Sequence, residues 1–341
     1  MVSSTVRSQV AGRSMEKSHH YSPVLHLRNF VGNAPAGHIW TYDKQSGNSR
    51  SSIPEETGFE THFYSVEKDD GTKDTTIEKF LSDVESKAAP VYRGLLEGKL
   101  PEGQPKADFA NFLAAMYSRT PSMRRMFGEM QSRGLQIHNY AYGANDKAFE
   151  AFVKRSGGPP LDEKGLEALR SALLDPSQFE IQVSRESTLR CLGVMDELTP
   201  IFFRMGWTVV YAAHGYFITC DNALTKAVNP KSVSPFYGDG GFMNKTVEVT
   251  FPLSPKVMLL MTWAEKPRSQ LDAPREAADG WNRTRASHAE RFLYAHLDDK
   301  RIAQLAAEQA HSRPGMTMQG FGPKKFAKTT IRRKLSRSGA G

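Results

Sequence analysis

Three residues whose side chains suit metal binding or acid–base chemistry stand out, and they lie far apart along the chain. His20 is one of two paired histidines near the start of the ordered sequence, and a neutral imidazole can bind a metal ion. Glu85 lies close to the apolar stripe of a predicted helix, where a half-buried carboxylate needs a cation or a donor. Asp221 follows an apolar strand, which is a frequent place for a metal ligand or a general base.

Arginines gather at a predicted helix boundary. Arg119-Thr120-Pro121 is followed about one turn later by Arg124 and Arg125, and arginines near a helix N-terminus suit an anionic group such as phosphate or carboxylate. Salt bridges to helix carboxylates would explain the same cluster. A structural role is the alternative for the paired histidines, and an Asx turn or a helix cap is the alternative for Asp221.

The charge of the chain is distributed unevenly, which bears on its partners. The 341 residues carry a formal net charge of +8. Residues 1–18 contribute +2 and residues 321–341 contribute +7, so residues 19–320 carry −1. The C-terminal cations are Lys324, Lys325, Lys328, Arg332, Arg333, Lys334 and Arg337. Because basic segments attract polyanions by counterion release, we predict that these seven residues bind nucleic acid or another polyanion. A solvated end without a specific partner is the alternative.

Composition and motifs exclude several classes of protein. The two cysteines are too few for a disulfide scaffold or a four-cysteine zinc site. The longest apolar runs, such as Val257–Trp263, are far shorter than the ~20 residues that a membrane helix needs. The sequence has no phosphate loop, dinucleotide-binding glycine motif, Gly-x-Ser-x-Gly elbow or His-Glu-x-x-His. We expect a cytoplasmic protein with no integral membrane segment that is not a kinase, nucleotide-binding dehydrogenase, zinc protease or α/β-hydrolase.

The order of predicted elements favours an α+β fold. β-rich runs at 38–43 and 59–66 come first, and a helical block follows at about 74–204. Short β-rich segments return after this block, and two helices, 281–296 and 301–311, close the body. Strands and helices do not alternate as they do in βαβ units. We expect a mostly antiparallel sheet with a helical block inserted between its strands and helices at the C-terminus.

The first of the closing helices is rich in cations. They are Arg283, Arg285, His288 and Arg291. An amphipathic helix that packs on the core explains this pattern better than a helix that contacts nucleic acid.

Several different short motifs follow one another along the body. They are His20-Tyr21-Ser22-Pro23, Leu27-Arg28-Asn29-Phe30, Ile39-Trp40-Thr41-Tyr42-Asp43-Lys44, Arg119-Thr120-Pro121, Thr219-Cys220-Asp221-Asn222-Ala223 and Pro252-Leu253-Ser254. Together they resemble the bacterial family of domain of unknown function 4238, although Cys220 and Ala223 replace the family's Ser and Pro. The family has no settled activity, so the resemblance implies no chemistry.

The resemblance raises His20, Glu85, Arg119 and Asp221 above their neighbours as one candidate site. We predict that His20, Glu85 and Asp221 are catalytic residues that converge on a divalent metal ion, Mg²⁺ or Mn²⁺. In this site Arg119 would hold a phosphate group and balance its charge. These are the residues that a metal-dependent phosphodiesterase or nuclease requires.

Two further predictions concern the substrate and the class of function. Tyr21 and Arg28, from the opening motifs, are predicted to bind substrate alongside Arg119. The alternative to an enzyme is a non-enzymatic binding module, in which the polar residues form a buried network that joins the N-terminal segment to the sheet. The basic tails of that module would contact nucleic acid or a partner protein.

The resemblance also bears on domain limits. It spans roughly residues 19–300 and leaves both basic ends outside. We expect a flexible basic lead-in at 1–18, a single α+β body at 19–312 and a basic, disordered tail at 313–341.

Overall fold

The structure is a computed structural model of the chain. The residues that it describes are 18–33, 35–61, 63–64, 66–67, 73–175, 177, 181–234 and 238–315. The chain divides into two compact units. Unit 1 contains the chain up to Arg124 together with Leu189–Pro314, and unit 2 contains Arg125–Thr188.

The larger sheet of unit 1 has five strands. Across the sheet they are β12 (Gln270–Ala273), β7 (Gly206–Ala212), β11 (Val257–Thr262), β10 (Glu248–Pro252) and β9 (Thr225–Ala227). β12 and β7 pair in parallel, and the other neighbours are antiparallel. Both faces are apolar, because successive buried side chains point to opposite sides: Val209 and Leu259 join one core cluster, whereas Val210 and Met258 join another.

Three helices cover the first of these faces. They are α2 (Thr76–Leu96), α3 (Gly103–Ser118) and α8 (Val194–Arg204). α3 contacts both α2 and α8, and it is buried almost all round, from Phe109 to Met116. A helix that is apolar on every side must be enclosed by its neighbours. α2 is amphipathic instead, with Leu81, Val84 and Ala88 on its buried side.

The smaller sheet combines the early hairpin with two late strands. Across the sheet they are β3 (Ser49–Ser52), β2 (Ile39–Asp43), β13 (Phe292–Ala295) and β8 (Thr219–Cys220). All its pairs are antiparallel. α10 (Lys300–Glu308) packs on one face, and α1 (Val24–Leu27) contributes Leu27 to the cluster on the other.

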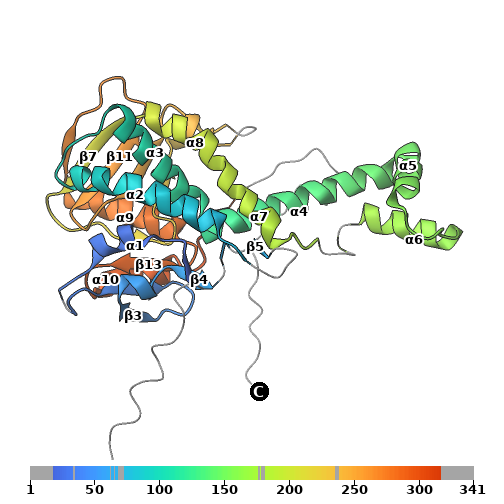
Figure 1. Ribbon diagram of the computed structural model, residues 1–341, viewed down its shortest axis with the longest axis horizontal. Coiled ribbons are helices and arrows are strands. Elements are labelled where there is room, and N and C mark those ends of the chain that lie inside the picture. Colours follow the sequence, from blue (N-terminus) through green and yellow to red (C-terminus); the bar gives the residue numbers. More distant parts are fainter. Residues whose placement is uncertain are drawn as a thin grey trace, which may run out of the picture. The chain divides into compact units, whose positions relative to one another are not determined.

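Helix α9 (Arg275–His288) lies between the two sheets (Figure 1). Ala278, near its N-terminus, packs with Val210 and Met258 of the larger sheet. Ala286, near its C-terminus, packs with Leu293 of the smaller sheet. Polar side chains on α9 that face either sheet are therefore removed from solvent.

Two small ribbons complete the sheets of unit 1. β1 (Ser18–His20) pairs with β4 (Phe59–Thr61), and β5 (Val66–Glu67) pairs with β6 (Lys73–Asp74). Both pairs are antiparallel. The first ribbon carries the paired histidines.

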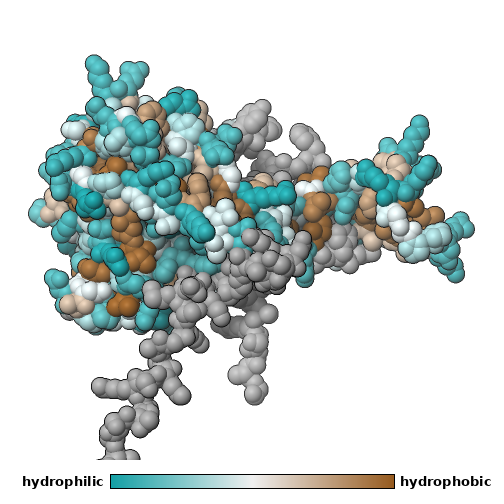
Figure 2. All heavy atoms as spheres, viewed as in Figure 1, coloured by the Kyte–Doolittle hydropathy of each residue, from teal (hydrophilic) through white to brown (hydrophobic). Residues whose placement is uncertain are grey.

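Unit 2 is helical. Its helices are α4 (Pro121–Ala144), which begins in unit 1, then α5 (Asp146–Ser156), α6 (Glu163–Leu174) and α7 (Arg185–Leu189). Side-chain caps start α5 and α6, since Asn145 accepts from the amide of Ala148 and Asp162 from that of Gly165. Brown, apolar atoms gather where α5 and α6 lie (Figure 2).

The predicted α+β class is confirmed, with mostly antiparallel sheets and the block α2–α8 between their strands. The strands form separate sheets rather than one, and the predicted helix 281–296 is wrong at its end. α9 stops at His288, and Phe292–Ala295 is the strand β13. Its Phe-Leu-Tyr run suits a buried strand. The predicted domain limits stay predictions. No helix within the described residues is long and apolar enough to cross a membrane.

Candidate functional site

His20 lies at the end of β1, half-buried beside two charged residues. Its Nε2 lies 3.1 Å from the backbone oxygen of Glu55. Burial lowers the pKa of His20; the charge of Arg119 acts in the same direction and that of Glu85 opposes it. The structure therefore brings His20, Glu85 and Arg119 into one neighbourhood.

Arg119 follows α3 and is the centre of this neighbourhood. Only 1% of the residue is exposed. Its Nε donates to the backbone oxygen of Tyr21 at 3.1 Å, and its Nη1 donates to Glu85 Oε1 at 2.7 Å. Its own carbonyl accepts from the hydroxyl of Tyr64. Arg119 thus ties the N-terminal segment to α2 and α3.

His26 makes a second link from the N-terminal segment into the interior. It is fully buried, with Nδ1 3.0 Å from the Tyr92 hydroxyl and Nε2 2.8 Å from Thr219 Oγ1. The Tyr92 hydroxyl donates to the carbonyl of Leu253, so it accepts from a protonated Nδ1, and Thr219 donates to Nε2. Burial lowers the pKa of His26 to about 3, so the imidazole is neutral.

Asp221 anchors the turn that leads into β13. Its Oδ1 accepts from the amide of Glu290 at 2.8 Å, and its Oδ2 accepts from those of Arg291 at 2.7 Å and Phe292 at 2.8 Å. Burial raises its pKa to about 6, although the three amides act in the opposite direction. The carboxylate is therefore engaged by backbone donors on both oxygens.

Lys44 and Arg285 hold the same region, a role that the sequence does not predict for either residue. The Lys44 ammonium is buried and donates to the carbonyls of Ala286, Ala289 and Ser312, so it binds the C-terminal end of α9. In the sequence Lys44 is simply a lysine after a predicted strand, and this position does not predict a contact with a distant helix.

Arg285 is buried between the two sheets, and none of its hydrogen-bond partners among the described residues is a carboxylate. Its guanidinium donates to the backbone oxygens of Ala223 and Thr250 and to the hydroxyl of Thr250. Burial lowers the pKa of Arg285 to about 10. The cations of the predicted helix therefore have different roles. Arg285 packs between the sheets, whereas Arg291 lies beyond the end of α9 and pairs with Asp43.

The predicted metal group does not assemble. Among the described residues, no three or more His, Cys, Asp or Glu side chains are grouped so that they could hold a metal ion. His20, Glu85 and Asp221 therefore do not surround one point. Tyr21 is buried, and the exposed Arg28 pairs with Glu55 at 2.7 Å; their predicted contact with substrate stays a prediction.

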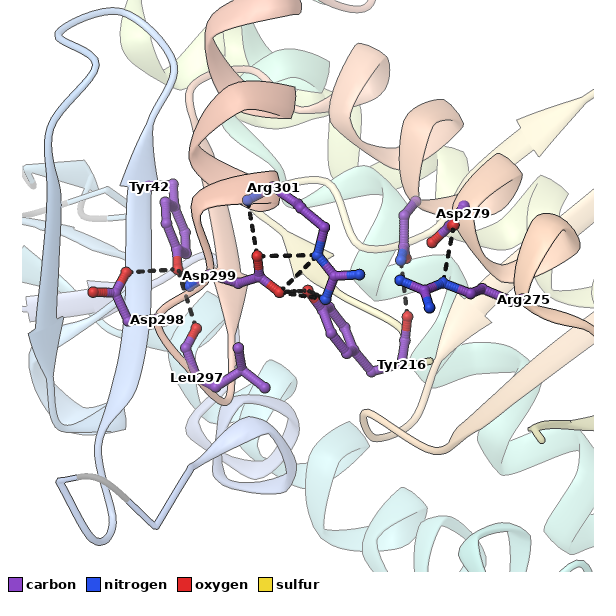
Figure 3. Close-up of polar contacts among 9 residues, drawn as sticks. Tyr42, Tyr216, Arg275, Asp279, Leu297, Asp298, Asp299 and Arg301 are labelled. Atoms are coloured by element: carbon purple, nitrogen blue, oxygen red, sulfur yellow. Dashed lines mark hydrogen bonds and ion pairs between the residues drawn. The ribbon is translucent and has the colours of Figure 1, made fainter. Parts of the chain in front are cut away.

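A cleft of about 230 Å³ opens between α9 and α10, with Tyr216 and Ile218 among its lining residues. Figure 3 shows Tyr216, Asp299 and Arg301 side by side. The Tyr216 hydroxyl donates to Asp299 Oδ2 at 2.5 Å, and Arg301 Nη2 donates to the same oxygen at 2.6 Å. The sequence does not predict the cleft, because most of its lining residues come from α9 and α10, and Tyr216 and Ile218 belong to an apolar segment. Both patterns indicate core packing.

The seven predicted polyanion-binding residues lie outside the described part of the chain, at 321–341. They are Lys324, Lys325, Lys328, Arg332, Arg333, Lys334 and Arg337. Their role stays a prediction from charge.

Comparisons with known proteins identify the family of this chain. No curated protein and no solved structure matches this chain. A family model described as a protein of unknown function, DUF4238, matches residues 18–299, which is most of the chain. The chain therefore belongs to the DUF4238 family.

Proposed function

We propose that this protein is a non-enzymatic binding module that contacts nucleic acid through its basic C-terminal segment. The observation that carries the proposal is the segregation of charge. Residues 321–341 hold seven cations and no acid, whereas residues 19–320 are almost neutral. The cations of the segment therefore have no acid within it to neutralise them.

The contacts within the body support a scaffold role for the residues first considered catalytic. Arg119 is bonded to Glu85 and to the backbone of Tyr21. Asp221 is bonded to three backbone amides. A general base or metal ligand needs a free lone pair that reaches the substrate or the ion, whereas both oxygens of Asp221 already accept hydrogen bonds from backbone amides.

Nucleic acid fits the segment better than an acidic protein does. The phosphates of a nucleic acid carry one charge per nucleotide at regular spacing. When lysine and arginine side chains bind them, counterions condensed on the nucleic acid are released. A polyanion of uniform charge requires no matched surface. The proposal predicts binding without sequence preference and with strong dependence on salt.

The test uses fluorescence anisotropy with a labelled single-stranded RNA, for the full chain and for a variant that lacks residues 321–341. If all seven cations engage phosphates, the slope of log affinity against log salt is about −5 for the full chain. The shortened variant should lose most of the affinity and most of the slope. A full-length variant with the seven cations changed to glutamine controls for the loss of chain length. Unchanged binding by both variants would contradict the proposal.

The metal-dependent phosphodiesterase or nuclease stays a prediction. Its test is cleavage of DNA or RNA in Mg²⁺ or Mn²⁺ by the wild type, His20→Ala and Asp221→Ala. Asp221→Asn serves as a milder variant, because it retains one acceptor oxygen. Cleavage that His20→Ala abolishes in a folded protein would favour the enzyme over the binding module.

A further inference from the structure

We propose that the cleft between α9 and α10 is a binding site for a small ligand that bears a phosphate group. The site lies within unit 1 and is separate from the basic C-terminal segment. Three arginines line it, namely Arg275, Arg283 and Arg301. All three are exposed, so a ligand can reach them from solvent.

The base of the cleft is fixed by a buried amide. Asn282 on α9 is 6% exposed. Its Oδ1 accepts from the amide of Ile218 at 3.0 Å, and its Nδ2 donates to the carbonyl of Tyr216 at 2.8 Å. The lining segment 216–218 is therefore held against α9 by two hydrogen bonds, so the site is already formed before a ligand binds.

Arg301 is held in place on the α10 side. Asp299 caps α10 by accepting from the amide of Arg301 and also binds the Arg301 guanidinium. The guanidinium lies 5.6 Å above the Tyr216 ring. Fixing the guanidinium lowers the entropy lost when it binds a ligand.

The two arginines of α9 retain donors for a ligand. Arg283 has no hydrogen bond or ion pair with any other described residue. With the described residues Arg275 makes only a long ion pair, in which its Nε lies 3.8 Å from Asp279 Oδ2. They lie eight residues apart, so they share a helix face about two turns apart. An anion in the cleft would therefore meet donors from both helices.

The charge and size of the cleft indicate the class of ligand. Asp279 and Glu308 also line the cleft, and Asp299 neutralises Arg301, so the cations open to a ligand are Arg283 and the loosely paired Arg275. Guanidinium groups suit phosphate and carboxylate alike, but a phosphate monoester offers three terminal oxygens to donors on several sides, whereas a carboxylate offers two. At about 230 Å³ the cleft is smaller than the usual drug-sized pocket. It fits a mononucleotide or a sugar phosphate.

The test is isothermal titration of the full-length protein with two probes, inorganic phosphate and adenosine 5′-monophosphate, and with acetate as a carboxylate for comparison. We expect saturable binding to the wild type and a loss of about tenfold or more in affinity for Arg283→Ala, because a charge-assisted contact is removed. Arg283→Lys should retain part of the affinity. The C-terminal segment is present in every variant, so a loss on changing Arg283 cannot come from that segment.

The matched control is Arg93→Ala, which removes an exposed arginine of α2 and changes the net charge equally. It should bind both probes as the wild type does. The melting temperature of Arg283→Ala should also be unchanged, because the side chain contacts no described partner. Three results would overturn the proposal: no saturable binding to the wild type, equal losses in Arg283→Ala and Arg93→Ala, or acetate binding as tightly as phosphate.

Discussion

The body and the C-terminal segment of this protein use charged residues in opposite ways. In the body, buried charges are neutralised or hydrogen-bonded within the fold, as the contacts of Asp221, Arg119 and Lys44 show. In residues 321–341 seven cations follow one another without an acid. The net positive charge of the protein therefore comes from the C-terminal segment, and it gives no information about the role of the charged residues in the body. Changes at the buried charges of the body should therefore alter stability, and changes in the segment should alter polyanion affinity.

Asp221→Ala should have the largest effect on stability. The substitution leaves the buried amides of Glu290, Arg291 and Phe292 without their acceptor, at a cost of about 3–5 kcal/mol. Urea unfolding measures the loss. RNA affinity should be unchanged at a temperature where the variant is folded. A loss below about 1 kcal/mol would show that these contacts do not stabilise the body.

The pH dependence of stability should separate His26 from Asp221. The pKa of His26 is lowered to about 3 by burial, so its contribution is complete above its usual pKa of 6.5 and is lost as the pH falls. The pKa of Asp221 is raised to about 6, so its contribution is complete below 3.8 and is lost as the pH rises through 6. Between pH 4 and 6 the two effects oppose each other.

Substitution of either residue should therefore tilt the pH profile in a predictable direction. Relative to the wild type, His26→Gln should lose less stability on acidification from pH 6 to 4, by about 1.4 kcal/mol per pH unit. Asp221→Asn should lose more by a similar amount. His214→Gln, at an exposed histidine, is the control and should run parallel to the wild type. Parallel profiles for all the variants would contradict the interior role of both groups.

Asp299→Ala should cost less than Asp221→Ala, although Asp299 also accepts several hydrogen bonds. It caps α10 and binds Tyr216 and Arg301, but Arg301 is exposed, and its guanidinium can turn to water. We expect a loss of about 1–2 kcal/mol in urea unfolding. A loss as large as that of Asp221→Ala would mean that exposure does not distinguish the two carboxylates.

Arg28→Ala should have the smallest effect. The Arg28 side chain is 67% exposed in its pair with Glu55, and exposed ion pairs contribute little. Its unfolding free energy should fall by less than about 0.5 kcal/mol. Its RNA affinity should remain that of the wild type, since Arg28 belongs to the body. A clear loss of affinity would assign Arg28 a role in binding.

The sequence predicts the fold class better than it predicts the candidate site. Alternating or continuous apolar runs identify strands such as Val257–Thr262 correctly. The helix predicted to run on to His296 ends at His288. Lys44, far away in the sequence, binds carbonyls at this end, and Phe292–Ala295 pairs with β2 and β8 as a strand. Local periodicity carries no information about such a contact.

The site depends even more on tertiary contacts. His20, Glu85 and Arg119 do lie near one another, whereas Asp221 faces the turn before β13. A carboxylate after a strand fits a metal ligand and a backbone anchor equally well. Only the position of residues 290–292 decides between them.

The most direct test of the central claim is RNA affinity across a salt series for the wild type and for the full-length variant with seven glutamines in residues 321–341. We predict that the RNA affinity of the wild type falls steeply with salt, that the variant binds weakly at every salt concentration, and that the two proteins have equal unfolding free energies. Equal RNA affinity of the two proteins would contradict the central claim.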